Sequence, residues 1–266
     1  MLQKRVSIIC TREDAGRYHE YMTTLTLDEQ KLQEEALNFA RKNKKAIARR
    51  LTDPAIFVPE SNPVSVFMAG SPGAGKTESS KELLAELESK EPKARILRID
   101  PDDLRCEFPS YTGRNSYLFQ GAISIVVGRI LDLAHEQRQS FLLDGTLSSL
   151  KQARENVLRC LKSKRPVQIL YVYQDPIQAW KFVQARETQE GRNVPIERFI
   201  EQYFAARDVV NALKTEFGTD IMVDLLVKPN DSVGRLYKAG IDQIDNHVEE
   251  KYDRVGLAKV LAVGGE

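Results

Sequence analysis

The feature that most constrains the fold of this chain is a glycine-rich segment, Gly70-Ser71-Pro72-Gly73-Ala74-Gly75-Lys76-Thr77, called the P-loop below. It fits the pattern Gly-x-x-x-x-Gly-Lys-Ser/Thr and lies between an apolar run and a helical pattern, which is the context that this motif requires. Glycines let successive backbone N–H groups turn toward phosphate oxygens, and the helix N-terminus adds its dipole. The segment therefore predicts a nucleotide site in which Lys76 reaches the β- and γ-phosphates and Thr77 holds Mg²⁺.

Short apolar runs alternate with longer helical patterns after the P-loop, which indicates a parallel sheet with helices on both faces. The expected strands are Val64–Ala69, Arg95–Asp100, Ser140–Leu143, Val167–Tyr173 and Ile221–Val227. Helices are expected near 77–90, 115–138, 149–162, 176–186 and 196–216, with one or two more around 232–262. The predicted fold class is α/β, a P-loop kinase-like, five-stranded and mainly parallel sheet flanked by helices.

Residues 1–56 differ in character from residues 57–266 and are predicted to form a helical N-terminal segment. Thr26 and Glu29 make a Thr-x-x-Glu capping box, so a helix should follow and run to Leu51. A shorter helix is expected around Glu13 to Met22. An apolar stripe on the capped helix has to be buried, either across the nucleotide site or in the core.

Composition narrows the class of partner. Lys and Arg number 39 against 38 Asp and Glu, so no overall field points to nucleic acid. The few cysteines (Cys10, Cys106 and Cys160) have no metal-ligand spacing and are typical of a reducing compartment. The N-terminus does not resemble a secretory leader and no apolar stretch approaches membrane-spanning length. We expect a cytoplasmic protein that binds neither nucleic acid nor membrane.

Carboxylates follow two of the expected strands. Ile99-Asp100-Pro101-Asp102-Asp103 ends the second strand, and ligands of open parallel sheets lie beyond the carboxyl ends of their strands. Asp102 is the best candidate for the group that accepts a proton from an acceptor hydroxyl.

Leu142-Leu143-Asp144-Gly145-Thr146 ends the third strand in the same way. Asp144 is interpreted as a residue that holds Mg²⁺ through water or contacts the acceptor. The alternative interpretation is that Asp144 caps a helix or stabilises a turn.

A charged segment after the fourth strand contains Arg186, Gly191 and Arg192. Small kinases place a mobile lid here and use its arginines to neutralise the transferring phosphoryl group. Both arginines are predicted to close over the triphosphate, with an exposed, charged helix end as the alternative.

These stretches in this order resemble the zeta toxin family, P-loop kinases that phosphorylate UDP-N-acetylglucosamine and are often partnered by an antitoxin. The resemblance runs from about Phe57 to Asn230. It implies that Asp102 is the catalytic base, that Asp144 and Thr146 contact the sugar nucleotide, and that both lid arginines bind phosphates in the transition state. The product would be useless for wall synthesis, which implies toxicity.

Two residues depart from the family pattern, in which Glu usually stands at Asp144 and Arg often stands at Ser148. Both lie in the expected acceptor pocket, so an antibiotic or another small hydroxyl compound is the alternative acceptor. Family members are restrained by a separate helical antitoxin that covers the nucleotide site. The extra helical segment 1–56 is therefore interpreted as autoinhibitory in cis, or a separate antitoxin exists.

Overall fold

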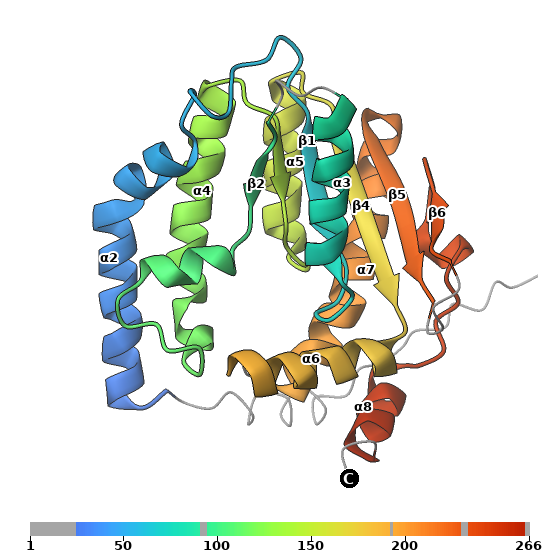
Figure 1. Ribbon diagram of the computed structural model, residues 1–266. Helices are drawn as coiled ribbons and strands as arrows, with labels where there is room; N and C mark the ends of the chain where they lie inside the picture. The colour runs from blue at the N-terminus through green and yellow to red at the C-terminus, as the bar shows by residue number, and fades with distance from the viewer. Residues whose placement is uncertain (1–24, 91–94, 192–193, 230–233, 264–266) are drawn as a thin grey trace, which may run out of the picture.

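The computed structural model describes residues 25–90, 95–191, 194–229 and 234–263. A six-stranded sheet in the order β2-β3-β1-β4-β5-β6 forms its centre (Figure 1). The strands are β1 (Ser65–Ala69), β2 (Leu97–Ile99), β3 (Phe141–Leu143), β4 (Val167–Gln174), β5 (Ile221–Lys228) and β6 (Leu236–Lys238). The first five are parallel, and β6 pairs antiparallel with β5. The five predicted strands are confirmed, each within two residues of its expected ends.

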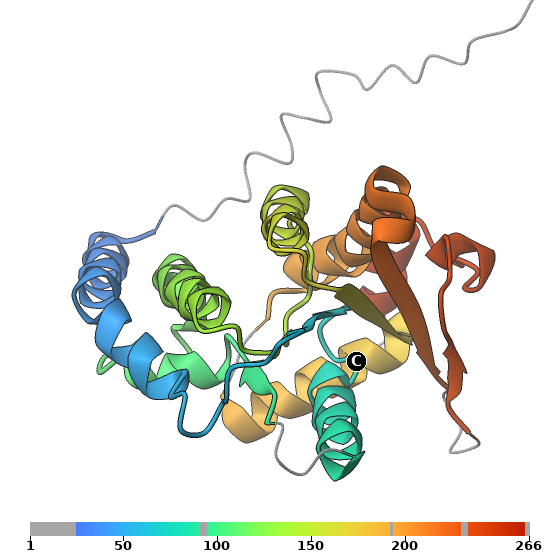
Figure 2. The ribbon, with the colours of Figure 1, turned by 90° about the horizontal axis from the view of Figure 1, so that it is seen from above.

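Helices cover both faces of the sheet (Figure 2). On one face lie α4 (Gln120–Glu136), α5 (Leu150–Lys162) and α7 (Ile196–Phe217), and on the other lies α3 (Lys76–Lys90). Two more helices, α6 (Pro176–Glu190) and α8 (Arg254–Val263), lie beyond the carboxyl ends of the strands (Figure 1). Short 3-10 turns at Asp103–Glu107 and Ser116–Phe119 connect β2 to α4.

The N-terminal helix α2 (Leu27–Leu51) begins at the predicted capping box, in which Thr26 Oγ1 accepts from the Glu29 backbone N–H at 3.2 Å. It packs along α4 (Figures 1 and 2) and adds buried Ala36, Ala40 and Ile47 to the main core. The helix thus buries its apolar stripe against another helix. The shorter helix predicted at 13–22 lies outside the described residues.

Helix α4 is strongly apolar and lies between α2 and the sheet (Figure 2). With the preceding turn it spans 21 residues, Ser116–Glu136, long and apolar enough by composition to cross a membrane. This corrects the expectation that no stretch reaches that length. Its buried face, which includes Val126 and Ile130, supplies the core.

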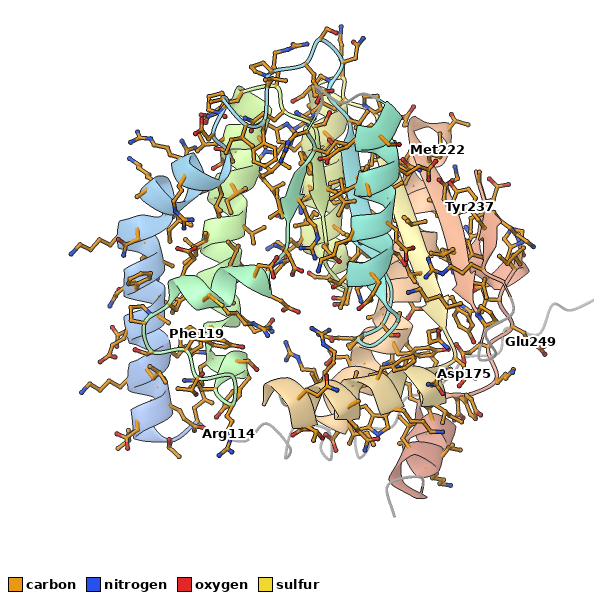
Figure 3. The ribbon with its side chains drawn as sticks, viewed as in Figure 1. Arg114, Phe119, Asp175, Met222, Tyr237 and Glu249 are labelled. Carbon is orange, nitrogen blue, oxygen red and sulfur yellow. The ribbon has the colours of Figure 1, made fainter. Side chains whose placement is uncertain are left out.

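The chain after Pro229 differs from the helices predicted around 232–262. The strand β6 pairs Tyr237 with Leu226 at the sheet edge. Tyr237, labelled in Figure 3, donates from its hydroxyl to Asp224 Oδ2 at 2.7 Å, and the Gly240 N–H donates to Asp224 Oδ1 at 2.8 Å. A buried aspartate thus fixes a three-residue strand that is too short to show alternation in the sequence. Of the one or two helices predicted around 232–262, the described residues contain one, α8.

Candidate active site

The P-loop connects β1 to α3 at the carboxyl edge of the sheet. Gly70, Gly73 and Gly75 have φ values of 136°, 72° and 77°, a region that L side chains rarely adopt. A Cβ at Gly70 would lie 2.3 Å from the Val172 oxygen. The close approach of the loop to β4 therefore requires glycine, and the backbone is free to face a phosphate.

Lys76 lies at the start of α3 and folds over the P-loop. Its Nζ donates to the backbone oxygens of Ser71 at 2.6 Å and of Gly70 at 3.0 Å. An ammonium held against the loop in this way lies where the phosphates of a nucleotide would be cradled.

The residues fit a bound Mg·ATP. Thr77 follows Lys76 in the first turn of α3, and its hydroxyl is a hard oxygen ligand of the kind that Mg²⁺ prefers. Among the described residues, no group of three or more His, Cys, Asp or Glu could hold a metal ion. Thr77 would hold magnesium together with nucleotide phosphates and water.

A cleft of about 1700 Å³ opens beside the P-loop. It is bounded by the P-loop, by the segments after β2 and β3, and by parts of α4, α5, α6 and α7. The predicted site residues that line it are Lys76, Thr77, Asp102, Asp144, Thr146 and Arg186. The fold therefore brings these residues of four separate segments to one space, as the sequence predicts.

Asp102 lies at the cleft after β2 and is held at two points. Its backbone N–H donates to Asp100 Oδ1 at 2.8 Å, and its carboxylate pairs with Arg105 at 3.0 Å between Oδ1 and NH2. The Asp102 side chain is 34% exposed, whereas that of Asp100 is 7% exposed. Of the two carboxylates, Asp102 is thus the accessible one.

The side chain of Asp100 is buried and lies among the charged side chains of Asp102, Asp144 and Arg98. Burial raises the pKa of Asp100 to about 6, and the negative charge of Asp102 adds to the rise, while the Asp102 N–H and Arg98 oppose it. Its role is to hold its neighbours in place, because one of its oxygens bonds to the Asp102 backbone and the other pairs with Arg98.

Asp144, after β3, is almost fully buried at the base of the cleft. Its Oδ2 accepts from Ser80 Oγ at 2.7 Å and from Arg98 at 2.6 Å. Thr146 connects to the P-loop, since its backbone oxygen accepts from the Gly70 N–H at 3.2 Å. Its hydroxyl pairs with that of Ser148 at 3.0 Å, at one of the two positions that depart from the family pattern.

Helix α6 carries the lid arginine that the structure describes. The helix begins at Asp175, labelled in Figure 3, whose carboxylate accepts from the N–H groups of Ile177 and Gln178. It ends at Gly191, whose φ is 69°. Arg186 lies near this end and lines the cleft. The second predicted arginine, Arg192, lies outside the described residues.

Sequence reasoning missed several basic residues of the site, and two of them contact the P-loop or the strand-end carboxylates. Lys228 ends β5 and donates from Nζ to the Gly75 backbone oxygen at 2.8 Å. Arg98 lies within β2 and contacts both Asp100 and Asp144. Lys228 gives a weak signal, as a lysine at the carboxyl end of a predicted strand. Arg98 gives another, as a charge inside a strand that should be covered on both faces.

Comparison with known families gives an assignment. The zeta toxin family model matches residues 47–242, most of the chain. This chain belongs to the zeta toxin family. The match begins inside α2, so the last turn of this helix is part of the zeta toxin unit. No curated protein matches the sequence.

Solved structures share the zeta toxin fold. One is from the PezAT chromosomal toxin–antitoxin system of Streptococcus pneumoniae, with 15% identity and a TM-score of 0.57 over 91% of this chain and 96% of that one. Another is the AvrRxo1-ORF1:AvrRxo1-ORF2 complex with sulphate ions, with 16% identity and a TM-score of 0.55 over 92% and 76%. The AvrRxo1-ORF1:-ORF2 structure with ATP has 16% identity and a TM-score of 0.51, over 92% and 75%. At these identities the likeness establishes the fold alone.

Proposed function

We propose that this chain is an ATP-dependent phosphotransferase that phosphorylates the 3′-hydroxyl of UDP-N-acetylglucosamine or a similar sugar nucleotide. The observation that carries the proposal is the common cleft of the P-loop and Asp102, which come from different strands. Its volume of about 1700 Å³ exceeds the roughly 300–1,000 Å³ of a pocket for one small ligand. Such a space suits ATP and a nucleotide-sized acceptor together.

The residues divide into three roles. Lys76 and the P-loop N–H groups bind the β- and γ-phosphates. Asp102 takes the proton of the acceptor hydroxyl while the hydroxyl oxygen forms a bond to the γ-phosphorus. The bond from that phosphorus to the bridging oxygen breaks, and ADP leaves. Arg186, and Arg192 by its place in the sequence, balance the charge on the moving phosphoryl group. Magnesium held by Thr77 would neutralise phosphate charge.

The acceptor contacts are proposed for Asp144 and Thr146, which lie beside Asp102 along the same sheet edge. The phosphorylated sugar nucleotide could not enter wall synthesis, so the chain would act as a cytoplasmic toxin. The complex with ATP among similar folds supports the choice of nucleotide.

A restraining partner is part of the proposal. The PezAT relative belongs to a toxin–antitoxin system, which supports a separate antitoxin for this chain. The alternative is restraint in cis by the N-terminal segment 1–56. Its helix α2 packs on α4 and contributes to the main core, and residues 1–24 of the segment lie outside the described residues.

A second candidate acceptor is an antibiotic or another small hydroxyl compound. Two local contacts favour it. Asp144 already accepts from Ser80 and Arg98, and Ser148 pairs with Thr146 in place of a family arginine. The carboxylate of Asp144 is thus already occupied by protein donors, and Ser148 lacks the positive charge that a family arginine would offer to a sugar nucleotide.

An acceptor screen with purified protein separates these functions. ADP release from Mg·ATP would be measured with UDP-N-acetylglucosamine, with other sugar nucleotides, with hydroxylated antibiotics and with no acceptor. Stimulation by UDP-N-acetylglucosamine or by another sugar nucleotide supports the proposal, and stimulation by a hydroxylated antibiotic alone selects the second candidate. Absence of turnover with tight ATP binding would indicate a nucleotide-gated binding protein instead.

A further inference from the structure

Arg98 lies at the centre of a charge cluster that joins the two carboxylate-bearing strand ends. It is the middle residue of β2, and its side chain is only 15% exposed. Its guanidinium donates from Nε to Ser80 Oγ at 3.2 Å, and from NH1 to Asp103 at 2.9 Å. Its NH2 donates to Oδ2 of Asp144 at 2.6 Å and also to Oδ2 of Asp100. One side chain therefore connects β2, α3 and the end of β3.

The sheet itself creates the need for this cation. Ile99 of β2 lies opposite Leu143 of β3, so the next residues, Asp100 and Asp144, leave neighbouring strands side by side. Their side chains are 7% and 2% exposed. Two buried carboxylates at such a place repel each other unless a cation lies between them.

The cluster continues to the proposed base. Asp100 uses Oδ2 for Arg98 and Oδ1 for the backbone N–H of Asp102, at 2.8 Å. A carboxylate held from one side by a guanidinium has little freedom to turn. The backbone position of Asp102 is thus tied to Arg98 through a single intervening side chain.

We propose that Arg98 is a positioning residue that holds the side chains of Asp100 and Asp144 beside each other and, through Asp100, fixes the backbone of Asp102 at the cleft. This role rests on the proposed function, because Asp102 is the base of that reaction. Arg98 itself does not line the cleft among the described residues, so it acts through its neighbours.

The geometry calls for arginine rather than lysine. Its nitrogens reach Ser80, Asp103 and the pair of carboxylates in different directions. A lysine ammonium is a point charge on a flexible stem and lacks the planar fork. Arg98→Lys therefore preserves the charge but loses the alignment, whereas Arg98→Met loses both.

The test measures one property that does not depend on turnover. The side-chain carboxyl carbon of Asp100 would be followed by NMR against pH in the full chain, and assigned by its loss in Asp100→Asn. The midpoint in the wild type is expected near 6. Because the Arg98 charge lowers the pKa of Asp100, Arg98→Met should move the midpoint upward by about one pH unit or more. Arg98→Lys should move it less, and Arg154→Met, which removes a surface pair with Glu216, should not move it.

Kinetics give the second readout. Arg98→Met should lower kcat about 10- to 100-fold while the Kd of ATP stays within about twofold, because the P-loop contacts are untouched. Arg98→Lys should recover part of kcat. An unchanged Asp100 midpoint in Arg98→Met would overturn the positioning role. A wild type that turns over no acceptor would overturn the proposed function, and the Asp100 titration would still decide the role of Arg98.

Discussion

The Nζ of Lys228 donates to the backbone oxygen of Gly75 at 2.8 Å, and this contact joins the end of β5 to the P-loop. A Cβ on Gly75 would lie 2.1 Å from the same Nζ, so the lysine occupies space that glycine leaves free. Burial lowers the pKa of Lys228, while the charge of nearby Glu78 opposes this. The P-loop is therefore supported from the end of β5 by a cation that the sequence motif does not include.

Replacing Lys228 should weaken nucleotide binding. Lys228→Met removes one charge-assisted hydrogen bond to the loop, worth about 1 kcal/mol at a half-buried position, which is about fivefold in the Kd of ATP. Isothermal titration with Mg·ATP would measure the change. Lys162→Met, at an exposed position on α5, is the matched control and should bind ATP like the wild type. Equal affinities for wild type and Lys228→Met would mean that the contact does not support the loop.

The lid arginine should act mainly on the transition state. Arg186→Ala is expected to lower kcat about 10- to 100-fold and to weaken ATP binding only about twofold, because the charge that it balances develops during transfer. Single-turnover kinetics and ATP titration give the two numbers. Lys181→Ala, an exposed cation on the same helix, should change neither. Equal losses in kcat and ATP affinity would make Arg186 an ordinary ground-state contact.

Asp100 should leave a signature in the pH dependence of stability. Its folded pKa of about 6 lies above the ordinary value of 3.8, so between these values the folded chain holds a proton that the unfolded chain has lost. Stability from this group is present below about pH 4 and is lost as pH rises to about 6, on the order of 3 kcal/mol.

Chemical unfolding at several pH values compares the wild type with Asp100→Asn. The free energy of unfolding of the wild type, minus that of the variant, should fall between pH 4 and 6. Subtraction is needed because half-buried His135, whose pKa burial lowers to about 4, acts in the opposite direction in both proteins. A difference that stays flat or rises with pH would contradict the burial of an ionised Asp100.

The N-terminal segment makes two separable predictions. Deleting residues 1–53 removes Ala36, Ala40 and Ile47 from the core and exposes the face of α4, so we expect an aggregating or much less stable protein. Deleting residues 1–24 alone keeps α2 in place. If these residues restrain the site in cis, this shorter deletion should tighten ATP binding and raise turnover. A soluble 1–24 deletion with unchanged affinity for ATP would contradict restraint in cis.

Much of the fold could be predicted from the sequence because its signals are local. The P-loop pattern, the Thr26–Glu29 capping box and the apolar strand runs each depend on neighbouring residues. Family resemblance then assigned the cleft residues Asp102 and Asp144. The strand β6 was missed because its pairing depends on Asp224, a contact between separate segments.

The site residues Arg98 and Lys228 were missed for the same physical reason as β6. Arg98 and Lys228 have no motif of their own, and each acquires its role from partners that only the fold brings near. An arginine within a strand is unfavourable in isolation and becomes favourable between two carboxylates. Such a cluster cannot be inferred before the register of β2 and β3 is known.

The most direct test of the account is transfer of the γ-phosphate of labelled ATP to UDP-N-acetylglucosamine by the wild type and by Asp102→Asn. The substitution keeps the size of the side chain but cannot accept a proton, so transfer should fall by about 10²- to 10⁴-fold with ATP binding retained. Lys76→Ala, which loses the loop ammonium, should also abolish transfer and stay folded. Labelled product from the wild type alone, phosphorylated at the 3′-hydroxyl, is the predicted result. Near wild-type transfer by Asp102→Asn, or no transfer by the wild type, would contradict the central claim.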